Sequence, residues 1–204
     1  MKINIFGIGG DFLYDIIETC HRNKVKFQLI NTAKINIKEE KYTDAENITR
    51  KIRIRKTVLG LARPKSKEEG LLSARNLGFL SFYNLFDEKS TISKSVEFGE
   101  GNYVNAGVVI SPYTNIGSFV TINRGALIGH HVQISDFSFI GPGAIINGRS
   151  IVSEGVFVGA GAIIRDGVII GKNSTIGAGS VVIEDVPENV TIFGNPARIK
   201  LGSS

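Results

Sequence analysis

The amino-acid sequence predicts a small α/β domain followed by a parallel β-helix. First, an Ile, Val or Phe recurs at every sixth position from Ile92 to Val182, over fifteen consecutive steps. Such a period fits neither an α-helix nor a β-hairpin, whereas three six-residue rungs make one 18-residue coil of a β-helix. Second, residues 2–6 alternate like a short strand and lead directly into glycines and a helical pattern. We therefore expect an α/β domain over residues 1–86 and the β-helix, with a C-terminal cap, over residues 87–204.

The residues around each sixth position support this interpretation. The position two before it is usually small or Val, and the position after it is mostly Gly, Asn or Ser, which suits tight corners between short strands. A solenoid of this kind could be a structural rod as well as an enzyme, because a fold does not prove a function. Val and Ile residues outside the core would be buried if three such prisms packed side by side, so we expect a homotrimer with grooves between its subunits.

Composition limits the class of protein. The chain has no run of 18 apolar residues and no cleavable signal pattern at its start, so we expect a cytoplasmic protein without membrane insertion. The single cysteine, Cys20, cannot form an internal disulfide, and its place in a helical pattern favours a buried structural thiol over a nucleophile.

The charge of the chain is unevenly distributed. Residues 1–89 carry 17 basic and 11 acidic side chains, whereas residues 90–204 carry 7 and 8. We interpret the basic excess as a site for a small phosphorylated ligand. Nucleic acid is not an expected partner, because no basic stripe with interleaved aromatic residues accompanies the charge.

A glycine turn near the start is the first candidate binding element. The sequence G-I-G-G at residues 7–10 stands between the strand of residues 2–6 and a helix expected over residues 11–23. Glycines in such a turn let backbone N–H groups approach a phosphate at the helix N-terminus. Asp11 could instead simply cap the helix. The second strand, residues 26–30, ends at Asn31 and Thr32 without the acidic residue that usually holds a ribose in dinucleotide domains.

Four further elements complete the first domain. Charge alternates with isoleucine over residues 51–56, which favours a half-exposed strand over a phosphate clamp. The strand of residues 57–61 ends at Ala62, on the side where open α/β sheets bind ligands. We expect a helix over residues 66–76, capped by Ser66 and followed by Gly78, and then a last strand and linker into the β-helix over residues 80–86.

Only three histidines are present, His21, His130 and His131. His21 lies on the first predicted helix, on an exposed face. His130 follows the core position Ile128 by two residues, so we expect it at a corner of the prism, facing outward into a groove between subunits. Alternation along the rung should turn His131 away from His130. An adjacent pair without a third coil-related histidine does not suit a three-histidine zinc site, and we expect no metal.

The segment of residues 123–144, NRGALIGHHVQISDFSFIGPGA, resembles the active-site segment of bacterial sugar acyltransferases. This family includes the bacillosamine-pathway N-acetyltransferase and the sialic-acid O-acetyltransferase. Its members have a small Rossmann-like domain before a left-handed β-helix, the order expected here over essentially the whole chain. The resemblance implies acetyl-CoA as co-substrate and a nucleotide-linked amino sugar as acceptor.

The resemblance also implies roles for particular residues. His130 corresponds to the general base of the family, and Asn123 corresponds to its active-site asparagine. The positions that contact the nucleotide-linked sugar in relatives are Gly9, Gly10, Asp11, Asn31, Thr32 and Ala62. The positions that contact acetyl-CoA are Phe139, Ala160 and Ala178.

Spacing supports the last two of these positions. Ala160 and Ala178 are 18 residues apart and so share a corner of the solenoid, with Pro142 one coil earlier, and small side chains there leave the backbone open to a pantetheine arm. Two departures from the family are His131, where relatives usually have Glu or Asp, and Phe139, where some relatives have a second His.

We therefore expect an acetyl-CoA-dependent N-acetyltransferase that acts on a nucleotide-linked amino sugar in surface-glycan biosynthesis, with His130 as general base. One alternative is O-acetylation of a sugar such as sialic acid, with the same base and a hydroxyl nucleophile. Another is a non-catalytic, trimeric scaffold that binds sugar nucleotides. Turnover of acetyl-CoA separates this scaffold from both enzymes.

Overall fold

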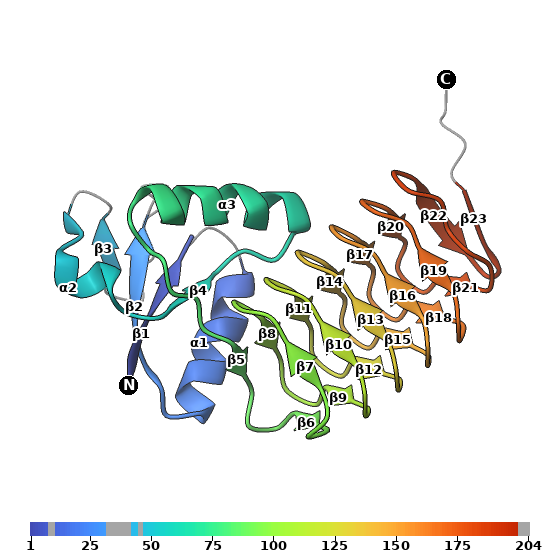
Figure 1. The fold of residues 1–204 in the computed structure, drawn as a ribbon, viewed down its shortest axis with the longest axis horizontal. Coiled ribbons are helices and arrows are strands. Elements are labelled where there is room, and N and C mark those ends of the chain that lie inside the picture. The colour runs from blue at the N-terminus through green and yellow to red at the C-terminus, as the bar shows by residue number, and fades with distance from the viewer. Residues whose placement is uncertain (8–10, 32–41, 45–46, 200–204) are drawn as a thin grey trace.

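The computed structural model describes residues 1–7, 11–31, 42–44 and 47–199 and contains a small α/β unit followed by a long β-solenoid (Figure 1). The α/β unit has a four-stranded parallel sheet in the order β3-β2-β1-β4. Its strands are β1 (Lys2–Phe6), β2 (Lys26–Asn31), β3 (Tyr42–Asp44) and β4 (Thr57–Leu59).

Helices α1 (Phe12–Arg22) and α3 (Pro64–Asn76) cover opposite faces of this sheet. The apolar stripe of α1 packs with one set of strand side chains, including Ile5, whereas Leu71 and Ala74 of α3 pack with the alternate set, including Phe6. Successive side chains of a strand point to opposite faces, which explains this division. A short helix, α2 (Arg50–Arg53), lies at the end of the unit farthest from the solenoid (Figure 1).

Three predictions about this unit were wrong. Residues 51–56 do not form a strand, because α2 buries Ile52 and leaves Ile54 exposed. Helix α3 begins at Pro64 and not at Ser66, since proline suits the first helical turn, where its missing N–H is not needed. Of residues 80–86 only β5 (Leu85–Phe86) is a strand, and it belongs to the solenoid. Gly78 follows α3 in the left-handed region, as predicted.

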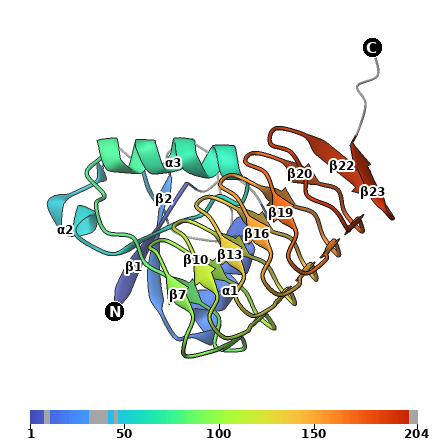
Figure 2. The ribbon, with the colours of Figure 1, turned by 45° about the vertical axis from the view of Figure 1, so that its right-hand side comes forward.

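The solenoid repeats with a period of 18 residues on three sheets. The residues at the sixth positions from Val104 onward form one continuous buried core, and Ile92 and Phe98 are partly buried against it. The predicted six-residue pattern is therefore confirmed. The division of the chain at residue 86 stays a prediction. Figure 2 shows the coils stacked side by side, from β7 near the α/β unit to β22 at the far end.

We name the sheet that faces the α/β unit the docked sheet. Its strands are β5, β8 (Tyr103–Val104), β11 (Thr121–Ile122), β14 (Phe139–Ile140), β17 (Phe157–Val158), β20 (Thr175–Ile176), β22 (Thr191–Gly194) and β23 (Ala197–Ile199). The last two form an antiparallel pair that closes the C-terminal end of the core.

The next sheet along the chain is the aliphatic sheet, since most of its outward side chains are Val, Leu or Ile. Its strands are β6 (Thr91–Ile92), β9 (Val109–Ile110), β12 (Leu127–Ile128), β15 (Ile145–Ile146), β18 (Ile163–Ile164) and β21 (Val181–Val182). The third, the mixed sheet, has polar outward side chains in its first three strands. It contains β7 (Glu97–Phe98), β10 (Asn115–Ile116), β13 (Gln133–Ile134), β16 (Ile151–Val152) and β19 (Ile169–Ile170).

A buried polar network fixes α1 to the first coils of the solenoid. The Thr19 hydroxyl donates to the Asp87 carboxylate at 2.9 Å and lies 2.9 Å from the Tyr103 hydroxyl, and Arg22 Nε donates to Asp87 at 2.7 Å. Burial opposes ionisation of Asp87, but hydrogen bonds from Arg22, the Lys89 N–H and Thr19 outweigh it and hold the pKa of Asp87 below its ordinary value.

Cys20 lies in the core between α1 and the sheet, as predicted. Burial raises its pKa to about 12, so the thiol stays protonated and unreactive at neutral pH. No helix within the described ranges has the length and apolar composition needed to span a membrane.

Candidate active site

A cavity of about 590 Å³ lies where the α/β unit meets the solenoid. Its walls come from the start of α1, the loop between β4 and α3, and the docked sheet with the corner that leads to the aliphatic sheet. The lining residues are Asp11, Phe12, Asp15, Ala62, Asn123, Arg124, Phe139, Pro142, Phe157, Gly159, Ala160, Thr175, Ile176, Gly177 and Ala178. We refer to this space as the junction cavity.

The junction cavity brings together six of the residues that sequence analysis selected. Asp11 and Ala62 come from the α/β unit, whereas the solenoid supplies Asn123, Phe139, Ala160 and Ala178. Candidate sugar-contacting and acyl-donor-contacting positions therefore share one space. Their roles stay predictions.

Asn31, a further predicted sugar contact, is not among the residues that line the junction cavity. Asn31 is buried at the end of β2, and its Nδ2 lies 3.4 Å from Asp44 Oδ1. The positions Gly9, Gly10 and Thr32 lie outside the described residues.

Asn123 is held in one orientation at the edge of the cavity. Its Oδ1 accepts hydrogen bonds from Asn105 Nδ2 at 2.9 Å, one coil earlier, and from the Arg124 N–H at 2.7 Å. No described residue accepts a hydrogen bond from its Nδ2. Asn123 therefore presents a fixed N–H donor at a place where a carbonyl or oxyanion could bind.

An ion pair crosses the cavity between the two parts of the protein. Arg124 Nη1 lies 3.2 and 3.1 Å from the two carboxylate oxygens of Asp15 on α1. Sequence reasoning missed this pair, and no local pattern could have found it, because the residues are 109 positions apart.

Two stacked phenyl rings form part of the cavity wall. Phe139 and Phe157 occupy equivalent positions in consecutive coils, with centroids 4.8 Å apart and planes within 4° of parallel. The Arg63 guanidinium lies over Phe157, 5.4 Å from its centroid. Thr175 follows one coil later and also lines the cavity. Stepping 18 residues from Phe139 could have found both Phe157 and Thr175.

Lys67 fixes the position of α3 on the docked sheet. Its side chain is fully buried, and its Nζ donates to the Phe119 carbonyl oxygen at 2.9 Å and to the Thr121 hydroxyl. Burial lowers the pKa of Lys67 to about 7. Since α3 follows directly after the loop that carries Ala62, this contact also positions one wall of the junction cavity.

His130 lies at the other edge of the aliphatic sheet, at the corner that follows β12 and leads to the mixed sheet. It is exposed, as predicted, and its ring lies over Gly148 of the next coil. The junction cavity, by contrast, opens at the corner that precedes β12. The two predicted catalytic residues, His130 and Asn123, therefore flank the aliphatic sheet of one protomer and do not share one cavity.

The expectation that His131 turns away from His130 was wrong. Their Nδ1 atoms are 3.1 Å apart, and the His131 ring also packs beside Tyr113, with centroids 5.1 Å apart. The cause is the backbone, because His131 has a φ of 58° and strand alternation does not apply at a left-handed corner position. His131 thus occupies the place beside the predicted base.

Within the part of the chain that the structure describes, no cluster of three or more His, Cys, Asp or Glu side chains is arranged to bind a metal ion.

Comparisons with known proteins agree with this arrangement. A family model described as bacterial transferase hexapeptide (six repeats) matches residues 149–184. A solved structure of perosamine N-acetyltransferase from Caulobacter crescentus, a histidine mutant in complex with CoA and GDP-perosamine, is 28% identical with a TM-score of 0.92 and covers 99% of this chain and 98% of that chain. The chain resembles sugar acyltransferases over its whole length. The expectation of an acyltransferase enzyme with a hexapeptide β-helix is therefore confirmed.

Two further solved structures share the fold at lower identity. The acetyltransferase domain of PglB from Neisseria gonorrhoeae, in complex with acetyl coenzyme A, is 22% identical, with a TM-score of 0.86 and coverage of 97% of this chain and 98% of that chain. WeeI from Acinetobacter baumannii is 24% identical, with a TM-score of 0.85 and coverage of 98% and 100%. A comparison with curated protein sequences found no match.

Proposed function

We propose that this acyltransferase moves an acetyl group from acetyl-CoA to the amine of a nucleotide-linked amino sugar, in surface-glycan biosynthesis. The observation that carries the proposal is the junction cavity, in which positions from the α/β unit and from the small-residue corner of the solenoid line one space. The Caulobacter enzyme, at 28–29% identity, holds CoA and GDP-perosamine together, and in two of its structures one histidine is replaced. We place the reaction in the cytoplasm, where acetyl-CoA is available.

The proposed chemistry needs a base, an oxyanion donor and a path for the leaving group. The amine nitrogen attacks the thioester carbonyl carbon, and His130 accepts the proton that the amine loses. Asn123 Nδ2 donates to the oxygen that becomes negatively charged. When the carbon–sulfur bond breaks, the protonated His130 returns its proton to the CoA sulfur. The products are the N-acetylated sugar and CoA.

A homotrimer would bring these residues together. In a closed ring of three prisms whose aliphatic sheets face the common axis, the corner after β12 of one protomer meets the corner before β12 of its neighbour. His130 of one subunit would then face the junction cavity of the next. Exposed aliphatic side chains on this sheet support the arrangement, since Val109, Leu127 and Ile163 are between 37% and 43% exposed in a single chain.

The test is turnover with identified products. The protein is incubated with acetyl-CoA and a panel of GDP-, UDP- and dTDP-linked amino sugars, with the matching hydroxyl sugars as controls. We expect CoA thiol release with an amino sugar, and a product heavier by one acetyl group on nitrogen. A product acetylated only on oxygen would support sugar O-acetylation instead. Absence of CoA release with every acceptor would contradict an enzymatic role in this pathway.

A further inference from the structure

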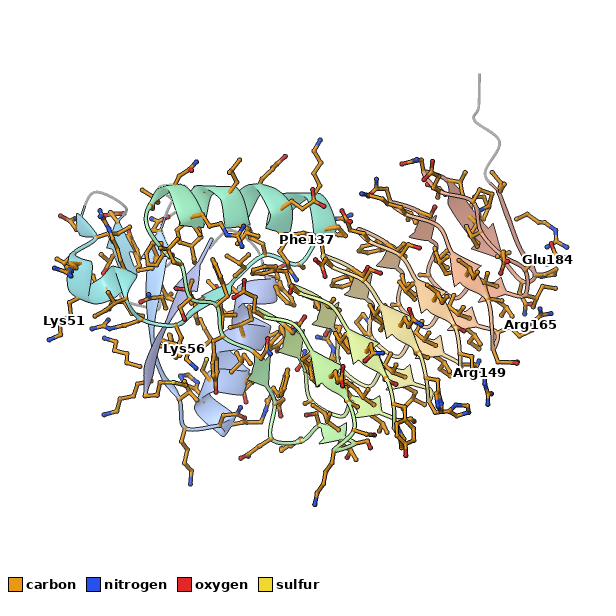
Figure 3. All side chains as sticks on the ribbon, in the orientation of Figure 1. Lys51, Lys56, Phe137, Arg149, Arg165 and Glu184 are labelled. Carbon is orange, nitrogen blue, oxygen red and sulfur yellow. The ribbon has the colours of Figure 1, made fainter. Side chains whose placement is uncertain are left out.

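Two arginines continue the His130 edge of the solenoid toward its C-terminal end. Arg149 follows β15 and Arg165 follows β18, one and two coils beyond the coil of His130. Both are exposed, and Figure 3 shows them reaching outward at the rim of the solenoid. The Arg149 backbone N–H donates to the His130 carbonyl oxygen at 2.9 Å, so the two residues share one stacked corner. No carboxylate of the described residues forms an ion pair with either guanidinium.

Beyond Arg124, the opposite edge of the aliphatic sheet carries small residues and, among the residues described, no free positive charge. In the coils beyond Arg124 its corners carry Pro142, Ala160 and Ala178, and a Cβ added at the glycines that follow them would meet nothing within 4 Å. The edge is therefore open but has no cation of its own, and Arg124 is already paired with Asp15. An anionic ligand that lay along this edge would need positive charge from elsewhere.

The length of the pantetheine arm and the spacing of the coils indicate where along the solenoid axis that positive charge is needed. The pantetheine arm of CoA is about as long as four extended residues, or about 14 Å, which separates the thioester from the diphosphate. Coils stack about 4.8 Å apart, so the backbone of Arg165 lies about 10 Å along the axis from His130, and its side chain extends several ångströms farther. One coil beyond, the same corner carries Glu184 and Asp185, which would repel phosphate. The cationic part of this edge is thus confined to the coils of Arg149 and Arg165, with Asp166 as the acidic neighbour.

We propose that Arg149 and Arg165 of one protomer bind the phosphate groups of an acyl-CoA held along the open edge of the neighbouring protomer. This inference rests on the proposed acetyl transfer and on packing through the aliphatic sheet. Guanidinium groups bind phosphate through paired, charge-assisted hydrogen bonds, which lysine cannot reproduce in the same geometry. The protomer that supplies the base would then also select a phosphorylated donor.

The experiment compares two acetyl donors, acetyl-CoA and S-acetylpantetheine, which lacks the phosphates. For Arg149→Ala and Arg165→Ala we expect the KM for acetyl-CoA to rise about 10- to 100-fold, the range for losing a charge-assisted hydrogen bond, with little change in kcat. The KM for S-acetylpantetheine should stay at the wild-type value. The matched control is Lys172→Ala, an exposed cation that is paired with Glu154 at a different corner and should change neither KM. Equal changes for both donors, or none, would overturn the inference.

Calorimetric titration of CoA into the trimeric protein gives a readout that does not depend on catalysis. We expect the arginine variants to bind CoA more weakly than wild type and Lys172→Ala to bind it normally. If wild type turns over acetyl-CoA and binds CoA no better than the arginine variants, the phosphate site is wrong and the proposed function stands. If wild type binds no CoA, both are wrong.

Discussion

At the scale of single residues, the position of the His130 ring depends on its contact with Gly148 of the next coil. A Cβ added at Gly148 would lie 2.9 Å from His130 Cε1 and Nε2, which is closer than side chains pack, and the ring is the part that can move. We expect Gly148→Ala to displace the imidazole and to lower kcat about 10²-fold, the usual cost of misplacing a catalytic group by about 1 Å. The measurement is steady-state turnover, beside His130→Ala, which should lose about 10²–10⁴-fold.

The control for this prediction is Gly167→Ala, at the same corner one coil beyond Gly148. Gly167 has a φ of 70°, and an added Cβ would meet nothing within 4 Å, so alanine brings backbone strain without touching His130. We expect a lower melting temperature and unchanged kcat for this variant. A wild-type kcat in Gly148→Ala would mean that the position of His130 is not important for catalysis.

At the scale of elements, the contact between α3 and the docked sheet depends on a buried amine. The pKa of Lys67 falls to about 7 on folding from an ordinary value of 10.5, so between these values the unfolded chain binds more protons than the folded one. The free energy of unfolding should therefore rise with pH from about 7 to about 10.5, by at most about 1.4 kcal/mol per pH unit from this group. Below pH 7 both states are protonated, and this pH dependence disappears.

Lys67→Met tests this prediction, because it keeps the length of the side chain and removes the titrating group. Denaturant unfolding at several pH values should show a smaller rise in stability above pH 7 for Lys67→Met than for wild type. Lys65→Met, an exposed position on the same helix, should leave the wild-type profile unchanged. Parallel profiles for wild type and Lys67→Met would show that Lys67 is not the titrating group.

At the scale of the whole molecule, two faces of the solenoid carry equally exposed aliphatic residues, and the proposed trimer should use only one of them. Leu127 on the aliphatic sheet and Ile169 on the mixed sheet are both 43% exposed. We expect Leu127→Glu to dissociate the protein to monomers at micromolar concentration, since three buried carboxylates would meet near the common axis. Light scattering after size-exclusion chromatography measures this. Ile169→Glu should stay trimeric, and the opposite result would identify the mixed sheet as the interface.

A shared site between protomers also predicts complementation. A His130→Ala protomer lacks the proposed base but keeps an intact junction cavity, whereas an Ala178→Trp protomer keeps the proposed base but has a blocked corner. Each variant alone should be nearly inactive. Coexpressed in equal amounts, they should recover about one quarter of the wild-type activity. Each site in the closed ring needs His130 from one protomer and an open cavity from its neighbour, and each of these is present in about half of the protomers. No recovery in verified mixed trimers would place the base and the cavity in one protomer.

The solenoid and the outline of the α/β unit could be predicted from the sequence, because both follow from local periodic patterns of apolar residues. A side chain every sixth residue defines a rung, and every eighteenth defines a stack, so the corner of Ala160 and Ala178 and the outward direction of His130 followed from counting. Where the local pattern was ambiguous, as at α2, burial decided between helix and strand, because Ile52 packs in the core and Ile54 stays exposed.

Tertiary structure alone decided how the parts of the site meet. The Asp15–Arg124 pair and the contact of Lys67 with Thr121 join residues far apart in the chain, and no period links them. The contact between His130 and His131 arises from a left-handed corner that strand alternation does not describe. Local periodicity determined which residues lie on each edge of the prism. Long-range packing decided which edges face the α/β unit. It also decided that His130 lies across the aliphatic sheet from the junction cavity, and a one-dimensional pattern does not contain this information.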